Sequence, residues 1–156
     1  MKLIYHNRKP NIQFEEETGA SYVDMETLLQ KSDYLSIHVP LSEETKHMIS
    51  TKEFEIMKRT AVLINTSRGP VVDEKALAVA LQKGQIWGVG LDVYENEPDI
   101  EEGLFGLENV VLAPHTGSGT TSTRDKMVEM VVQNVLLALK GETPPNCVNP
   151  EYRDNL

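Results

Sequence analysis

The sequence predicts an α/β fold with a mainly parallel, doubly wound sheet. Short apolar segments alternate with helical patterns along the 156 residues, as in consecutive βαβ units. Residues 61–64 are wholly apolar, the composition of a strand buried on both faces. The chain then turns polar at Asn65-Thr66-Ser67-Arg68 and reaches Gly69-Pro70. A polar exit from a buried strand marks the edge where open α/β sheets hold ligands.

The first part of the chain contains three expected strands. Residues 2–5 form the first and run into the basic, polar segment His6-Asn7-Arg8-Lys9. The acidic segment 11–19 is predicted as a loop or one helical turn. A short strand at 20–23 precedes a helix through Gln30 that Asp24 caps, and the next strand covers 34–39.

The central part continues the alternation. Ser50-Thr51-Lys52-Glu53 has the form of a capping box and opens a helix before the strand at 61–65. Asp73 is expected to cap the following helix, and Gly84 to end it. The next strand, 86–93, is rich in glycine, which indicates close backbone approach.

The last expected strand covers 110–113 and leads to Pro114-His115. A long helix then runs from about Thr121 to Lys140, with Gly141 as its stop signal. Its apolar residues cover more than one face, so we expect it to be buried on several sides, with any exposed part serving as an interface.

Composition excludes several classes of function. The net charge of -9 disfavours binding to nucleic acid or to an anionic membrane, and no apolar run is long enough to span a bilayer. The single cysteine, Cys147, excludes an internal disulfide and fits a reducing compartment. The four histidines are scattered, so no metal site is expected. The N-terminus does not resemble a signal peptide, and the expected location is cytoplasmic.

Polar groups gather at the carboxyl edge of the predicted sheet. Parallel strands share this edge, so residues that follow different strands should lie close together there. The residues concerned are Asn7, Arg8, His38, Pro40, Thr66, Ser67, Arg68, Asp92 and His115. Their number favours a ligand site over chance.

Three of the charged or titratable residues suggest a division of labour. Arg68 would bind a substrate carboxylate and polarise the adjacent carbonyl. His115 would donate or accept the proton, and Glu97 would hold its imidazole in one tautomer. Taken singly, each residue has an ordinary structural alternative: Arg68 and Glu97 in surface loops, and His115 in a turn.

Four segments together resemble the D-isomer-specific 2-hydroxyacid dehydrogenase family, especially its glyoxylate, hydroxypyruvate and 2-ketogluconate reductases. The segments follow one another in the family's order and at its spacing. They are 28–49 with Ser36-Ile37-His38-Val39-Pro40, 57–73 with Asn65-Thr66-Ser67-Arg68-Gly69, Gly90-Leu91-Asp92-Val93-Tyr94 with Glu97-Pro98, and Ala113-Pro114-His115-Thr116-Gly117-Ser118. The resemblance covers nearly the whole chain.

The resemblance implies an NAD(P)-dependent oxidoreductase that reduces a small 2-oxo acid such as glyoxylate or hydroxypyruvate. It implies Arg68 as the substrate anchor, Glu97 as the partner carboxylate and His115 as the acid/base. Residues expected to line the cofactor are Asn7, Arg8, His38, Val39, Pro40, Thr45, Thr66, Ser67, Asp92, Gly117 and Ser118. The expected fold is an incomplete Rossmann-type sheet.

The end of the first strand suggests a cofactor preference. NAD-specific members would have an acidic residue there, to bind the ribose 2′-hydroxyl. This chain has His6-Asn7-Arg8-Lys9, and cations favour a 2′-phosphate, so NADP(H) is expected over NAD(H). A solvated basic turn is the alternative.

The chain departs from the family at its beginning. The Gly-x-Gly-x-x-Gly loop that seats the pyrophosphate does not occur in the sequence, and neither does the strand that should precede it. We therefore expect residues 1–118 to form a partial nucleotide-binding domain. Residues 119–156 would form a crossing helix and tail that pack on an absent substrate domain.

The missing central strand should leave two sheet edges unpaired. The strands at 2–5 and 34–39 could pair directly, or strands could pair between chains in a homo-oligomer. A chain that lacks this strand and loop is expected to be inactive alone, or to need its N-terminal half. The alternative function is a non-catalytic remnant that acts as an interaction module.

Overall fold

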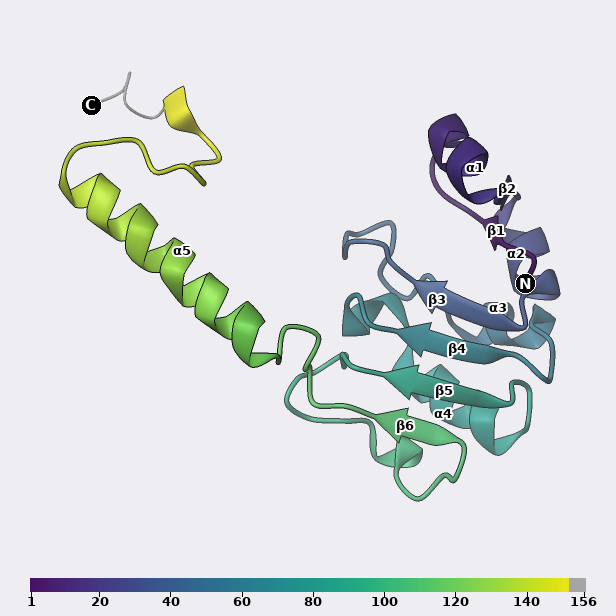
Figure 1. The fold of residues 1–156 in the computed structure, drawn as a ribbon. Coiled ribbons are helices and arrows are strands. Elements are labelled where there is room, and N and C mark those ends of the chain that lie inside the picture. The colour runs from purple at the N-terminus through teal and green to yellow at the C-terminus, as the bar shows by residue number, and fades with distance from the viewer. Residues whose placement is uncertain (152–156) are drawn as a thin grey trace. The chain divides into compact units, whose positions relative to one another are not determined.

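The computed structural model describes residues 1–151 (Figure 1). The chain forms two compact units, and the first ends at His115. This first unit contains both β-sheets. The expected boundary, after residue 118, lies three residues further along the chain than the observed one.

The main sheet has four parallel strands in the order β3-β4-β5-β6. These strands are β3 (Tyr34–Ile37), β4 (Val62–Asn65), β5 (Gly88–Leu91) and β6 (Val110–Leu112). All lie inside the ranges predicted from the sequence, and the α/β fold with a parallel sheet is confirmed. Gly88 makes the expected close approach, since a Cβ there would lie 2.8 Å from the carbonyl oxygen of Asn109.

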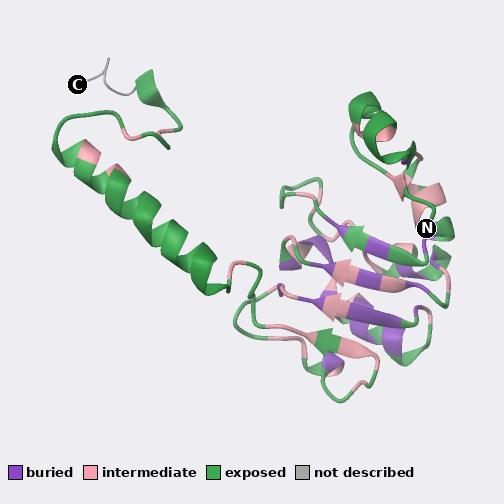
Figure 2. Cartoon of the chain, in the orientation of Figure 1, coloured by how far each residue is buried: buried purple, intermediate pink, exposed green. Residues whose placement is uncertain are grey.

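One face of the main sheet is buried more deeply than the other. In β4, Leu63 and Asn65 are buried, whereas Val62 and Ile64 are only half-buried. The expectation that this strand is buried on both faces is therefore wrong for this chain. The buried side chains pack with α2 (Met25–Lys31), α3 (Thr51–Ile56) and α4 (Glu74–Gln82) into one hydrophobic core, which is coloured purple in Figure 2.

The N-terminal residues form a separate small sheet. It contains β1 (Ile4–Tyr5) and β2 (Ser21–Tyr22), which pair in parallel. Among the described residues β1 does not pair with β3, so of the two alternatives, direct pairing of these strands is excluded. The aromatic rings explain why the small sheet holds together, because Tyr5 packs edge-on against both Tyr22 and Phe14. Pairing between chains stays a prediction.

The segment between β1 and β2 corrects a second expectation. Residues 11–19 were expected to form a loop or one turn, but they form the seven-residue helix α1 (Ile12–Thr18). Asn11 caps it by accepting a hydrogen bond from the Phe14 N–H, and Gly19 ends it at a φ of 69°. None of its residues is buried, so the helix is favoured by its caps together with the packing of Phe14 on Tyr5.

The predicted helix caps are confirmed. Asp24 accepts a hydrogen bond from the Thr27 N–H at 2.7 Å, and Ser50 and Glu53 form the capping box of α3. Asp73 accepts one from the Ala76 N–H at 3.0 Å and another from the Ser50 hydroxyl at 2.9 Å. Gly84, with a φ of 62°, follows the end of α4.

Replacing Asp73 with asparagine should remove an acid-sensitive part of the stability. Burial alone would raise the pKa of Asp73, but the hydrogen bonds from Ala76 and Ser50 outweigh it and hold this pKa below its ordinary 3.8. A lowered pKa in the folded state contributes stability above pH 3.8 that is lost as the pH falls through the folded value.

We expect Asp73→Asn to lower the free energy of unfolding by about 1 kcal/mol at neutral pH, and by progressively less in acid. Urea denaturation over a descending pH series measures this difference. Asp125→Asn, a change of the same kind on an exposed helix position, is the control and should have little effect. A loss for Asp73→Asn that does not depend on pH would contradict the prediction.

The second unit contains the long helix α5 (Thr121–Leu139), close to the range predicted. Gly141 follows it with a φ of 77°. The helix has no buried residue within the described chain, and the expectation that other parts of a protein bury it on several sides stays a prediction. Its exposed apolar side chains include Met127, Val128, Val131, Val135 and Leu139. In the described part of the chain, none of the helices combines the length and the apolar character needed to cross a membrane.

Candidate active site

The carboxyl ends of the four parallel strands meet at one edge of the main sheet (Figure 1). His38 follows β3, the segment 66–68 follows β4, Asp92 follows β5, and His115 lies beyond β6. The topology therefore brings together the strand exits that the sequence placed at a common edge.

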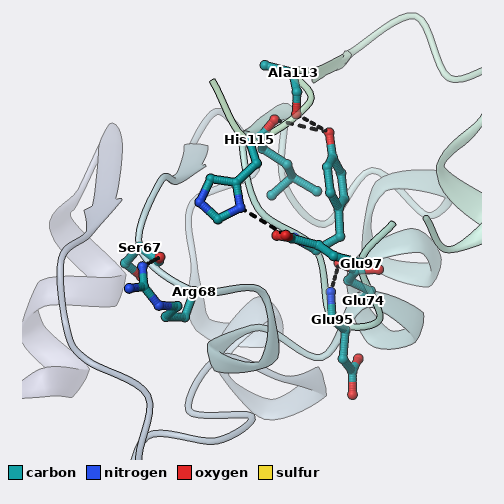
Figure 3. A network of polar contacts seen from close by, with 9 residues as sticks. Ser67, Arg68, Glu74, Glu95, Glu97, Ala113 and His115 are labelled. Atoms are coloured by element: carbon teal, nitrogen blue, oxygen red, sulfur yellow. Dashed lines mark hydrogen bonds and ion pairs between the residues drawn. The ribbon is translucent and has the colours of Figure 1, made fainter. Parts of the chain in front are cut away.

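Glu97 and His115 form a hydrogen-bonded pair at this edge, which is an ion pair when the imidazole is protonated. The Glu97 Oε2 lies 2.8 Å from the His115 Nδ1, and Figure 3 shows the two side chains facing each other. Both remain accessible, with side-chain exposures of 36% and 53% respectively. The bond to Nδ1 leaves Nε2 as the ring nitrogen on the opposite side, where a proton could be exchanged with a ligand.

The environment of Glu97 favours its ionised form. The hydrogen bond with His115 is the main cause of its lowered pKa, followed by one from the Tyr94 backbone N–H to Oε1 at 3.0 Å. The charges of His115 and Arg68 lower the pKa further. A carboxylate held in this way can fix an imidazole in one tautomer and orientation.

The backbone around His115 is fixed by Tyr94. The Tyr94 hydroxyl donates a hydrogen bond to the Ala113 carbonyl at 2.7 Å (Figure 3). The Ala113 N–H in turn donates to the Leu91 carbonyl at 2.8 Å, which continues the ladder beyond β6. His115 itself has a φ of 53°, a conformation that non-glycine residues rarely adopt. Tyr94 therefore binds Glu97 through its backbone N–H, and through its hydroxyl it binds Ala113, two residues before His115.

Arg68 lies at the same edge but does not bond to the pair. Its Nη1 donates to the Ser67 carbonyl at 2.6 Å, so the guanidinium turns back toward its own loop (Figure 3). Arg68 is the residue before η1 (Gly69–Val71). Its charge helps to lower the pKa of Glu97, but less than the hydrogen bonds to that carboxyl do.

Asn65 organises the loop that carries Arg68. This last residue of β4 is 1% exposed. Its Nδ2 donates to the Arg68 carbonyl at 3.0 Å, while its Oδ1 accepts from both the N–H and the hydroxyl of Ser67, at 3.1 and 3.0 Å. The sequence drew attention to this polar strand end but did not assign Asn65 to the site.

The residues expected to line a cofactor lie in four places, the last of which is the small sheet. His38, Val39, Pro40 and Thr45 belong to the segment after β3, where the Thr45 hydroxyl donates to the Pro40 carbonyl at 2.7 Å and His38 pairs with Ser36. Thr66, Ser67 and Asp92 follow β4 and β5, and the Asp92 N–H donates to the Asn65 carbonyl. Gly117 and Ser118 belong to the second unit.

Asn7 and Arg8 follow β1 in the small sheet, and both are exposed. The Asn7 Oδ1 accepts from the Arg8 N–H at 2.8 Å, and the neighbouring His6 ring stacks on Tyr22. These contacts shape the turn and leave the Arg8 side chain at the surface. Within residues 1–151, no three histidine, cysteine or acidic side chains are grouped as a metal site would require.

Two residues near the pair were missed by sequence reasoning. The Glu95 Oε1 lies 2.7 Å from the His47 Nε2. The backbone N–H of Glu95 donates to the Glu74 Oε1 at the same distance. Glu74 is one of the few buried charged or polar residues of the described chain. Nothing in the sequence distinguished Glu74 from an ordinary acidic residue in the first turn of a helix.

Comparison with known proteins agrees with this arrangement. A family model described as "D-isomer specific 2-hydroxyacid dehydrogenase, NAD binding domain" matches residues 1–117. A glyoxylate reductase of Thermococcus litoralis is 56% identical over 151 residues, which cover 97% of this chain and 46% of that relative. The chain thus spans about half the length of the curated relatives it matches.

Solved structures give the same picture. A glyoxylate reductase from Paecilomyes thermophila matches with a TM-score of 0.80 and 44% identity, over 92% of this chain and 44% of that one. An NADPH-dependent glyoxylate/hydroxypyruvate reductase from Sinorhizobium meliloti, in complex with NADP and malonate, has a TM-score of 0.80 and 37% identity. That match covers 88% of this chain and 42% of the other.

Proposed function

The chain belongs to the D-isomer specific 2-hydroxyacid dehydrogenase family, and we propose that it carries the catalytic groups for reducing a small 2-oxo acid such as glyoxylate or hydroxypyruvate. The observation that carries this proposal is the 2.8 Å pair between Glu97 and His115 at the carboxyl edge of the sheet. The chain spans about half the length of its relatives, so we propose, and do not infer from their names, that it takes part in the activity of a whole enzyme.

The proposed reaction divides between Arg68 and the ion pair. Arg68 would turn from Ser67 to bind the substrate carboxylate through its planar fork of donors. A bound nicotinamide cofactor would supply the hydride that adds to C2, and would leave oxidised. Protonated His115 would give the proton from Nε2 to the carbonyl oxygen, which becomes the hydroxyl of the 2-hydroxy acid.

Glu97 would keep the imidazole in place through both proton states. Its bond to Nδ1 holds the ring orientation, and its negative charge stabilises the imidazolium before the proton leaves. The three roles fit a catalytic site better than an interaction module, which has no need of them. The names of the relatives, glyoxylate reductases among them, do not favour the interaction-module alternative either.

The chain's residues fit part of a dinucleotide. Exposed Arg8 and Asn7 are suited to a ribose phosphate, and Asp92 follows β5 at the carboxyl edge of the main sheet. The sequence has no glycine-rich loop for the pyrophosphate. Because of Arg8, we propose NADP(H) as the preferred cofactor, and we propose that the protein is cytoplasmic. Because the loop is missing, this chain alone should bind the cofactor weakly. Assembly into a homo-oligomer, or with an N-terminal half, stays a prediction.

Nucleotide titration tests the proposal on the chain itself. We expect fluorescence titration to give saturable binding of NADPH and weaker binding of NADH. Arg8→Ala should weaken NADPH binding about tenfold or more, the value of a hydrogen bond to a charged group, and leave NADH binding unchanged. Lys83→Ala, which removes an exposed cation at the end of α4, is the matched control.

Equal affinity for the two nucleotides would overturn the NADP(H) preference. No binding of either would mean that the chain holds the catalytic residues without a cofactor site. Where binding is seen, oxidation of NADPH in the presence of glyoxylate or hydroxypyruvate is the next assay, and its loss in His115→Gln would support the acid/base role.

A further inference from the structure

Glu74 is a buried carboxylate that the proposed reaction does not use. It is the first residue of α4 and is only 4% exposed. An acidic side chain interacts favourably with a helix N-terminus at the surface as well, so the helix dipole does not explain this burial. Burial raises the pKa of Glu74, and buried carboxylates are tolerated when hydrogen bonds compensate them.

The partners of Glu74 are the backbone N–H groups at the two ends of a short loop. Oε1 accepts from the Glu95 N–H at 2.7 Å, and Oε2 accepts a longer bond from the Glu101 N–H at 3.4 Å. The loop between these two residues carries Glu97. Glu74 therefore spans the base of the loop that presents the catalytic carboxylate.

The peptide group that joins Tyr94 to Glu95 is the main point of attachment. Its N–H is the one held by Glu74, as Figure 3 shows. Gly69 packs directly against the same peptide, since a Cβ at Gly69 would lie 1.9 Å from the Tyr94 carbonyl carbon and oxygen. Gly69 follows Arg68, so this contact fixes the Arg68 backbone against the loop of Glu97.

Tyr94 connects the same peptide to the ion pair. Its N–H donates to Glu97, and its hydroxyl donates to the Ala113 carbonyl, two residues before His115. Three segments that carry the reacting groups thus converge on Tyr94 and the peptide group that follows it. Glu74 is the buried side chain that binds this peptide.

We propose that Glu74 is a positioning residue, which holds the Tyr94–Glu95 peptide and thereby sets Glu97 and His115 at their working separation beside Arg68. The importance of that separation for catalysis rests on the proposed function. The contacts themselves do not, and they can be tested in the chain without cofactor or substrate.

The test is the pKa of the Glu97 carboxyl, measured by carbon NMR in the unaltered chain and in Glu74→Gln. The glutamine amide turns a donor toward one of the two N–H groups, so the loop should loosen. Weaker bonds from His115 and Tyr94 should then raise the Glu97 pKa toward its ordinary value. Removal of the Glu74 charge alone would lower that pKa, because a nearby negative charge has been lost.

Glu53→Ala is the matched control. It removes another first-turn carboxylate that accepts a backbone N–H, at 3.0 Å from Ser50, without a link to the Glu97 loop. This variant should lose stability and leave the Glu97 pKa unchanged. A Glu74→Gln variant that loses stability with an unchanged or lowered Glu97 pKa would reduce Glu74 to a purely structural role and overturn the proposal.

A second measurement covers the case in which Glu74→Gln does not fold. In the unaltered chain, amide hydrogen exchange at Glu95 should be slowed to the level of the β4 and β5 amides. Exchange as fast as in exposed loops would overturn the proposal. Failure of NADPH to bind, together with a raised Glu97 pKa in Glu74→Gln, would contradict the proposed function and leave the positioning role standing.

Discussion

Gly69→Ala is expected to lower the free energy of unfolding by about 3 kcal/mol, at the upper end of the cost of overpacking. The added Cβ would lie 1.9 Å from the Tyr94 carbonyl carbon and oxygen, and 2.5 Å from the Glu95 nitrogen. These are backbone atoms and cannot swing aside as the end of a long side chain could. The chain must separate η1 from the 94–95 peptide, so the change should disturb stability and site geometry together.

Urea denaturation measures the stability loss, and Gly90→Ala is a matched control. Gly90 lies in the neighbouring strand β5, with no atom within 4 Å of the position that a Cβ would occupy. The same methyl group should therefore be tolerated there. The Glu97 pKa should rise in Gly69→Ala and not in Gly90→Ala. Similar stabilities for the two variants would show that the packing of Gly69 on the 94–95 peptide is not restrictive.

Local signals in the sequence predicted much of this architecture. Ser50, Glu53 and Asp73 were assigned to helix caps, and each has that contact, because a cap depends on residues within three positions of one another. The parallel order followed from the alternation of strands and helices. That order alone was enough to place the exits of β4 and β6 at one edge, and with them Arg68 and His115.

The contacts that arrange the site were not predictable in the same way. Gly69 and Tyr94 are distant in sequence, and no local pattern says that a glycine is needed where one backbone crosses another. Glu74 looks like any first-turn acid until the fold places two N–H groups over it. The pairing of β1 with β2 was not predicted, for a related reason. Packing of Tyr5 on Phe14 and Tyr22 holds these residues in a separate sheet, in place of direct pairing between the strands at 2–5 and 34–39.

Asn65→Asp is expected to lower the free energy of unfolding by about 3 kcal/mol or more at neutral pH, the cost of an uncompensated buried charge. The change preserves shape, but the donor to the Arg68 carbonyl is replaced by a second acceptor. At 1% exposure, water cannot compensate for two oxygens that face each other. The bonds that Asn65 accepts from Ser67 would survive.

The pH dependence of this loss identifies its cause. Burial should raise the pKa of the introduced carboxyl above the ordinary aspartate value. A group whose pKa is raised in the folded state contributes stability below its unfolded pKa and loses it as the pH rises. In acid the protonated carboxyl can again donate to the Arg68 carbonyl, so the difference from the unaltered chain should shrink.

Ser67→Ala provides the comparison for Asn65→Asp. It removes only the hydroxyl bond to the Asn65 Oδ1, and should cost about 1 kcal/mol at every pH. Urea denaturation of both variants from neutral pH downward gives the two profiles. A loss in Asn65→Asp as small and as independent of pH as that in Ser67→Ala would mean that the Arg68 carbonyl does not need its buried donor. The Arg68 loop would then be held chiefly by Gly69, whose contact with the 94–95 peptide lies one residue further along the chain.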